Sequence, residues 1–234
     1  MPEYWGACDP NNPKNRRTRA SILVEEGDTA IVVDTSPDFR EQMLSNRVKK
    51  IHSVFYTHDH ADHVHGIDDL RGFFHKTREK IPVYADEQTL NLLKKRFDYI
   101  FHTKEGYPAL CYGRTISGPI QAGDLNVIPF EQGHGRGISL GYRFGDMAYS
   151  TDLDRMTEAG FEALNGVKVW VVDALRYEPH PTHSHLEQTL KWIERVKPER
   201  AILTHMTWDM DYETLKAELP EGVEPAYDGM TITL

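Results

Sequence analysis

Apolar, β-branched stretches alternate with stretches of helical spacing along the 234-residue chain. Residues 21–24 and 30–33 flank a Glu-Glu-Gly-Asp turn, which is typical of a β-hairpin. Residues 86–97 carry leucines and a phenylalanine at helical spacing. Because strands come first in hairpins and then in strand–helix pairs, the order favours two packed sheets with helices outside. We expect a single domain over residues 1–234.

The same reasoning assigns the remaining elements. Further strands are expected at 54–56, 125–130, 138–144, 147–150, 169–172 and 201–203, and further helices at 37–46, 157–164, 186–193 and 212–219. The stretch Phe97–Gly123 is rich in tyrosine, glycine and lysine, and we interpret it as a long surface loop.

Composition narrows the class of protein. Apolar residues make up 39% and charged residues 27% of the chain, which is typical of a globular domain. We expect a cytoplasmic protein, because the sequence shows neither an apolar run that could span a bilayer nor a secretory signal. The two cysteines form no CxxC motif, which fits a reducing compartment. A net charge of −9 disfavours a nucleic-acid partner, although residues 14–19 form a local basic run.

The strongest chemical signal is the segment Thr57–His63, which holds three histidines and two aspartates directly after an apolar strand. Imidazole nitrogen and carboxylate oxygen suit zinc, manganese or iron. His58 and His60 stand two apart in an extended segment, so we expect them to point to one side. Asp62 and His63 follow where a helix is expected to begin. The segment therefore predicts two neighbouring pairs of metal ligands.

Candidates for further ligands stand at the ends of later predicted strands, where site residues of layered α/β folds collect. They are His134, Asp152 and His205. A carboxylate such as Asp152 could bridge two cations, as in two-metal hydrolytic sites. His134 or His205 alone is more often structural, but the His58–His63 cluster would repel itself without a cation. Since structural zinc sites are usually rich in cysteine, this donor set favours catalysis over a closed, non-catalytic metal-binding module.

The run His58-Asp59-His60-Ala61-Asp62-His63 carries the HxHxDH hallmark of the metallo-β-lactamase superfamily, which the chain resembles. The later candidates match that family's ligands in chain order. The resemblance implies the α/β fold of this family, a four-layer αββα sandwich. Within the superfamily the chain is most similar to PhnP-type phosphodiesterases, which act on a cyclic phosphate of ribose. Residues 15–19, 34–40 and 202–206 carry this similarity.

The resemblance also implies a cofactor of two divalent metal ions, Zn or Mn, and a division of the ligands between them. One ion takes His58, His60 and His134, the other takes Asp62, His63 and His205, and Asp152 bridges the two. The family has a further histidine that is not a ligand. We assign it to His183, because residues 186–188 begin the helix that usually follows it, and His180 and His185 remain alternatives.

The function implied by the resemblance is a dinuclear metal-dependent hydrolase, a phosphodiesterase that uses a metal-bridging hydroxide. We assign Asp62 and His183 to catalysis, with His183 binding a phosphate oxygen or protonating the leaving oxygen. Arg16 and Tyr107 are, with His183, candidate substrate contacts. The alternative interpretation is that Arg16 and Tyr107 lie in ordinary solvated loops. The expected partner is a small phosphorylated or nucleotide-like substrate. No membrane is expected, and a homodimer is the commonest oligomer.

Two other kinds of hydrolase remain open from the sequence. A ribonuclease Z-like nuclease would show a basic groove and binding that depends strongly on salt. A hydrolase of a non-phosphate ester, a lactone or a thioester could use the same metal pair, because activated water attacks any of these bonds.

Overall fold

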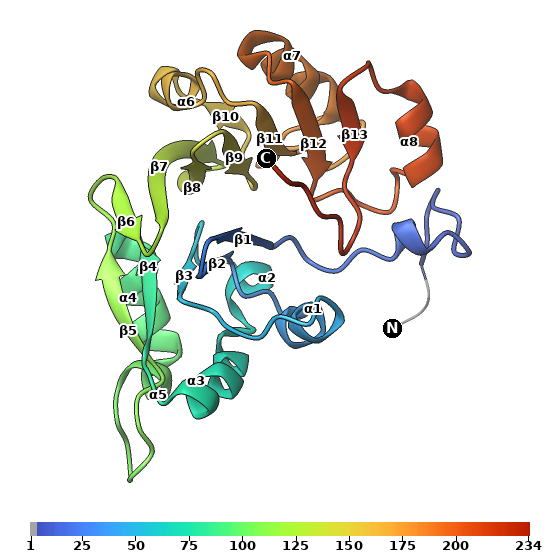
Figure 1. Ribbon diagram of the computed structural model, residues 1–234. Coiled ribbons are helices and arrows are strands. Elements are labelled where there is room, and N and C mark those ends of the chain that lie inside the picture. The colour runs from blue at the N-terminus through green and yellow to red at the C-terminus, as the bar shows by residue number, and fades with distance from the viewer. Residues whose placement is uncertain (1–3) are drawn as a thin grey trace. The chain divides into compact units, whose positions relative to one another are not determined.

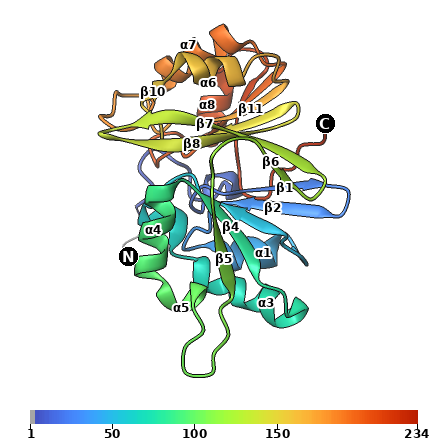
Figure 2. The same cartoon turned by 90° about the vertical axis from the view of Figure 1, so that its left-hand side faces the viewer.

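The computed structural model describes residues 4–234. The chain divides into two compact units, one of residues 19–129 and one of residues 130–234 together with the segment up to Thr18. Each unit contains a β-sheet accompanied by helices (Figures 1 and 2). Within residues 4–234, no helix has both the length and the apolar character that crossing a bilayer requires. The single domain over residues 1–234 stays a prediction.

The unit of residues 19–129 is built on a five-stranded mixed sheet in the order β1-β2-β3-β4-β5. β1 and β2 form the expected antiparallel hairpin, and each later strand runs parallel to its neighbour. The strands are β1 (Ile22–Glu26), β2 (Thr29–Val33), β3 (Ser53–Phe55), β4 (Ile81–Ala85) and β5 (Cys111–Thr115). The helices are α1 (Phe39–Ser45), α2 (Ala61–Val64), α3 (Arg71–Thr77), α4 (Glu87–Arg96) and α5 (Asp98–Phe101), with a 3₁₀ turn η2 (Ile67–Leu70).

The second sheet has the order β10-β7-β8-β9-β11-β12-β13, with β6 paired to β7. Its strands are β6 (Ile120–Ala122), β7 (Leu125–His134), β8 (Gly137–Phe144), β9 (Met147–Ser150), β10 (Arg155–Met156), β11 (Val169–Asp173), β12 (Arg200–Thr204) and β13 (Val223–Pro225). β9, β11, β12 and β13 are parallel, so their carboxyl ends meet at one edge. The helices of this unit are η1 (Pro13–Asn15), α6 (Glu158–Ala163), α7 (Leu186–Val196) and α8 (Tyr212–Glu218).

Each unit has its own apolar core. In the unit of residues 19–129, the strands and helices contribute side chains to one buried apolar cluster, which includes Val32, Val54 and Leu93. Trp170 at the centre of β11 is fully buried in the other unit, and its indole N–H donates to Ser150 Oγ at 3.0 Å. β11 is buried along its whole length, as expected of a central parallel strand. The mixed sheet and helices of each unit confirm the expected α/β class.

The interpretation of Phe97–Gly123 as a long loop is wrong. The stretch contains α5, β5 and β6, and β5 is the edge strand of the first sheet. In β5 only Cys111 is buried, whereas Tyr112 and Arg114 are exposed, so the strand lacks the apolar run that identifies buried strands. The helix expected from Pro37 begins later, at Phe39, because Ser36 Oγ accepts from the Asp38 N–H at 3.1 Å and caps a turn instead.

Candidate metal centre

The His58–His63 segment folds as expected, with an extended stretch after β3 that leads into α2. His60 is the N-cap residue of α2 and keeps an extended backbone. The buried His58 ring lies with its centroid 4.4 Å from the centroids of both His60 and His63. One Asp62 carboxylate oxygen is 3.4 Å from His63 Nε2. The two expected ligand pairs therefore meet in one cluster within the 19–129 unit.

A buried carboxylate, Asp34, supports this cluster from behind. Its Oδ2 lies 2.8 Å from His63 Nδ1, and it accepts hydrogen bonds from the Thr57 N–H and hydroxyl, each at 2.8 Å. With Nδ1 engaged, His63 turns Nε2 toward Asp62, and Asp34 stands where a carboxylate behind a metal-binding histidine would stand. Burial raises the pKa of Asp34, and His63 and Thr57 counteract part of that rise. Asp34 was not among the site residues predicted from the sequence.

Asp59, the residue between the first two histidines, has a different partner. Its carboxylate pairs with the Arg96 guanidinium of α4 at 2.5 Å. The same guanidinium donates to the Asp59 carbonyl, also at 2.5 Å. Asp59 therefore fixes the backbone of the motif to α4, while Asp34 orients the histidine.

The other unit gathers acidic and imidazole groups around Asp152, which follows β9. Asp152 Oδ2 lies 3.8 Å from Nε2 of both His134 and His183, and Oδ1 lies 3.5 Å from His205 Nε2. Asp152, Asp173, His183 and His205 each offer a ligand atom within 4.8 Å of the others. β9, β11 and β12 are parallel neighbours, and the carboxyl ends of such strands are where site residues collect.

Asp173, the last residue of β11, positions two of these histidines. Its Oδ2 is 3.1 Å from His183 Nδ1, and its Oδ1 is 3.7 Å from His205 Nδ1. Burial raises the pKa of Asp173; the hydrogen bond from His183 and the charge of His205 lower it, and the negative Asp152 raises it. Asp173 was also not predicted as a site residue. Asp34 and Asp173 each stand at the end of an apolar strand, and this pattern could have identified both.

Of the three candidate histidines, the structure brings His183 to Asp152 and Asp173. The His183 ring stacks on His205 with centroids 5.0 Å apart and planes at 19°. The His180 ring centroid is 5.1 Å from that of His183, and its Nδ1 faces the Thr182 N–H at 3.3 Å. Burial, together with the neighbouring His183 and Arg176 side chains, lowers the pKa of His180. His185 is the residue that precedes α7.

His134 is held by the loop that carries His183. Its Nδ1 lies 2.7 Å from the Thr182 carbonyl oxygen, so Nδ1 carries the proton and Nε2 is the atom that could bind a metal. Gly135 follows at φ +56°, and a Cβ there would stand 2.7 Å from Thr182 Cγ2. Glycine is therefore required at this position for backbone conformation and for the close approach of the loop.

Arg16 and Tyr107 lie outside these clusters. The exposed Arg16 guanidinium carbon is 5.9 Å from the Trp5 ring centroid. Tyr107 is 70% exposed, in a turn between α5 and β5 that projects away from its sheet (Figures 1 and 2). Their roles as substrate contacts stay predictions.

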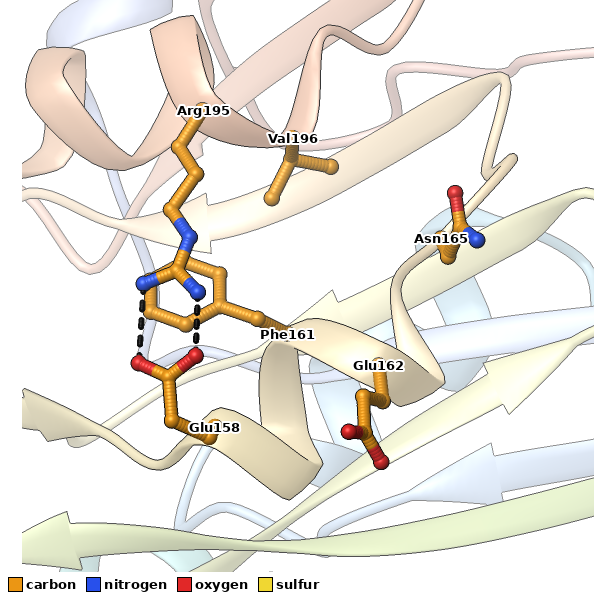
Figure 3. A pocket seen from close by; sticks show the side chains of 6 residues that line it. All are labelled: Glu158, Phe161, Glu162, Asn165, Arg195 and Val196. Carbon is orange, nitrogen blue, oxygen red and sulfur yellow. Dashed lines mark hydrogen bonds and ion pairs between the residues drawn. The ribbon is translucent and has the colours of Figure 1, made fainter.

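A hollow between α6 and α7 has different chemistry (Figure 3). Arg195 lies over the Phe161 ring, 3.7 Å from its centroid, and pairs with Glu158 through both guanidinium nitrogens. Because the Arg195 guanidinium already pairs with Glu158, this hollow is poorly suited to bind a phosphate.

The donor sets of both units fit divalent metal ions. Histidine nitrogen and carboxylate oxygen, without thiolate, suit zinc, manganese or iron. Asp34, Asp152 and Asp173 are at most 1% exposed. In each unit, a buried carboxylate carries a large desolvation cost, which a bound cation offsets. Metal binding therefore follows from the donor chemistry, whereas the identity and number of ions do not.

Comparison with known proteins agrees with this donor chemistry. The profile of the beta-lactamase superfamily domain matches residues 29–206. A solved structure named as a new diphosphatase from the PhnP family is 36% identical and has a TM-score of 0.89, with 96% of this chain and 87% of that chain covered. The expected metallo-β-lactamase fold is confirmed by these two similarities.

Two curated relatives are considerably longer than this chain. An octanoyltransferase of Porphyromonas gingivalis is 33% identical over 95% of this chain and 46% of its own length. A ribonuclease Z of Methanocaldococcus jannaschii is 27% identical over 53% of this chain and 41% of its own length. This chain thus aligns with less than half of each of these relatives.

Proposed function

The chain belongs to the metallo-β-lactamase superfamily and is a PhnP-like hydrolase, and from this premise we propose that it cleaves phosphodiester or diphosphate bonds with two divalent metal ions. The observation that carries the proposal is the strand-end cluster around Asp152, where His183 and His205 stand within 3.8 Å of one buried carboxylate. The similarity to a PhnP-family diphosphatase supports phosphate as the group attacked.

The proposed ligand assignment follows the family resemblance. His58, His60 and His134 would hold one ion, Asp62, His63 and His205 would hold the other, and Asp152 would serve both. When bound, such ions supply hydroxide at neutral pH and neutralise the charge that develops on phosphate oxygens.

The chain's own residues then have distinct tasks. Asp34 orients His63 through Nδ1, and Asp173 lies 3.1 Å from His183 Nδ1 and 3.7 Å from His205 Nδ1. Nε2 would then serve a metal in His63 and His205 and the substrate in His183. In the proposal His183 donates from Nε2 to a phosphate oxygen or to the leaving oxygen. General acid catalysis of this kind contributes about 10²–10⁴-fold to the rate. The proposed substrate is a small cyclic phosphate or another nucleotide-like ester.

The test is hydrolysis of bis(p-nitrophenyl) phosphate by protein of measured metal content. We expect wild type to turn over with about two equivalents of Mn or Zn. Asp152→Asn should lose metal and at least about 10²-fold in kcat, because it removes the proposed bridge. Asp146→Asn is the matched control: it alters an exposed carboxylate of the same unit that pairs with Lys168 at 2.6 Å. Wild type that binds metal but leaves the diester intact would refute the phosphate assignment.

Thioester hydrolysis is a second candidate, favoured by the octanoyltransferase relative. An acyl group such as octanoyl is commonly carried as a thioester, and metal-activated water attacks thioesters as well as phosphates. Release of thiol from an octanoyl thioester by the metal-loaded protein, absent in Asp152→Asn, would support this candidate.

A further inference from the structure

Trp208 is unusually exposed for its residue type. Its side chain is 52% exposed, and the neighbouring Tyr4 is 70% exposed. The two rings meet edge to face, with centroids 5.4 Å apart and planes at 81°. By contrast, Trp170 in the same unit is fully buried. Large aromatic groups that gather on a surface are a frequent mark of a binding site.

The exposed indole is held in place from its protein side. A Cβ at Gly6, which has φ +55°, would stand 2.4 Å from Trp208 Cδ1, so the indole packs directly on the glycine backbone. The Ala7 N–H donates to the Trp208 carbonyl at 3.0 Å. Arg17 donates to the carbonyls of Thr207 and Met210, at 3.2 and 2.7 Å. A ring fixed in this way loses little conformational entropy when a ligand stacks on it.

Trp208 also stands close to the strand-end cluster. It follows the proposed ligand His205 by three residues, so the two Cα atoms are at most ~11 Å apart. The Thr207 N–H donates to the Leu175 carbonyl at 2.9 Å, which joins this loop to the one after Asp173. A cavity of about 320 Å³ is lined by residues of the same two loops: Arg176, Tyr177, Glu178 and Asp209. Its volume is within the ~300–1,000 Å³ range of small-ligand sites.

We propose that Trp208 is a specificity-determining residue that stacks on the nucleobase of a small nucleotide whose phosphate lies at the cluster around Asp152. This inference rests on the proposed phosphate chemistry and names its substrate class. Stacking on aromatic side chains tolerates every base, because each base has a π-face. Loss of one stacking residue lowers nucleotide affinity by about 5- to 150-fold.

The experiment is calorimetric titration of the metal-loaded full chain with AMP and, separately, with ribose 5-phosphate, which lacks the base. We expect wild type to bind AMP at least about 5-fold more tightly than ribose 5-phosphate. Trp208→Ala should abolish that preference and leave ribose 5-phosphate binding unchanged, whereas Trp208→Phe should retain most of it. Tyr99→Ala, which removes a 46% exposed ring from the other unit, is the control and should behave as wild type.

Several outcomes would overturn the inference: equal binding of the two ligands by wild type, binding of neither, or an undiminished preference for AMP in Trp208→Ala. A short oligoadenylate that binds much more tightly than AMP would also overturn it, because the ligand would then be an RNA segment. The readout is binding and does not require turnover. An AMP preference that depends on Trp208 in a protein that cleaves no phosphodiester would uphold this inference while the proposed activity fails.

Discussion

Replacing Asp173 by asparagine tests whether one buried carboxylate positions the histidines at the carboxyl ends of β11 and β12. The side chain contacts His183 Nδ1 at 3.1 Å and His205 Nδ1 at 3.7 Å. Asparagine keeps the volume but loses the charge, and its amide can present NH₂ where Nδ1–H needs an acceptor. Removal of a carboxylate behind a metal-binding histidine typically lowers metal affinity or activity by 10- to 100-fold. Since two histidines depend on Asp173, we expect the upper end, about 100-fold.

The same substitution should not weaken folding. The Asp173 backbone carbonyl accepts from the hydroxyls of Ser184 and Thr189, each at 2.7 Å, and both bonds survive the change. Burial raises the pKa of the carboxyl, which means that its ionised form is disfavoured in the metal-free protein. Asparagine removes this desolvation cost, so the metal-free variant should be as stable as wild type or more stable by about 1 kcal/mol.

The assay pairs kcat on bis(p-nitrophenyl) phosphate at saturating Mn with urea unfolding of the metal-free protein. Asp173→Glu keeps the negative charge but has a longer side chain. It therefore separates the effect of the charge from the effect of the carboxylate's position. A loss of kcat without a loss of stability supports the positioning role. Two results would refute the reasoning: kcat within about 3-fold of wild type at full metal occupancy, or a metal-free Asp173→Asn variant destabilised by more than ~2 kcal/mol.

Three further predictions follow from local geometry. Chelation should lower Tm by about 5–10 °C in a thermal melt, because a ligand at about 100 Kd adds ~2.7 kcal/mol of stability. Gly135→Ala should reduce kcat more than stability, measured side by side, because its Cβ would displace Thr182 and with it the carbonyl that holds His134. Asp211→Ala should destabilise by about 1 kcal/mol at pH 7 in urea unfolding. Burial opposes ionisation of Asp211, but its hydrogen bonds lower its pKa from 3.8 to about 2, so this contribution is complete above about pH 4 and falls away as the pH drops toward 2.

Structural features formed by residues close together in the sequence were predicted best. The HxHxDH segment could be read directly, because its histidines and aspartates share one strand end and the start of one helix. The helix expected over 86–97 was also predicted well, since Asp86 caps it by accepting from the Thr89 N–H. Both features depend on local spacing, and local spacing is preserved in the fold.

Features made by distant residues could not be predicted in this way. Asp34 and Asp173 are single aspartates after apolar strands, and each becomes significant only when a histidine 29 or 10 residues away reaches it. β5 was missed because one face of an edge strand is exposed and carries polar residues. The neighbours of Trp208 in the sequence did not predict a role for it, because the residues that hold its loop, Gly6 and Arg17, lie near the other end of the chain.

Three residues of the two clusters share a strained backbone conformation. Asp34, Asp152 and His205 have φ values of +64°, +52° and +60°, in the left-handed region that favours glycine. Each costs on the order of 1–2 kcal/mol and persists only where the surroundings fix it. Each stands at the end of a strand, where a left-handed residue turns the chain sharply after the last pair of the ladder. In each unit the strain therefore lies at the end of a strand, where it orients a carboxylate or an imidazole, so fold stability is exchanged for side-chain geometry at these three positions.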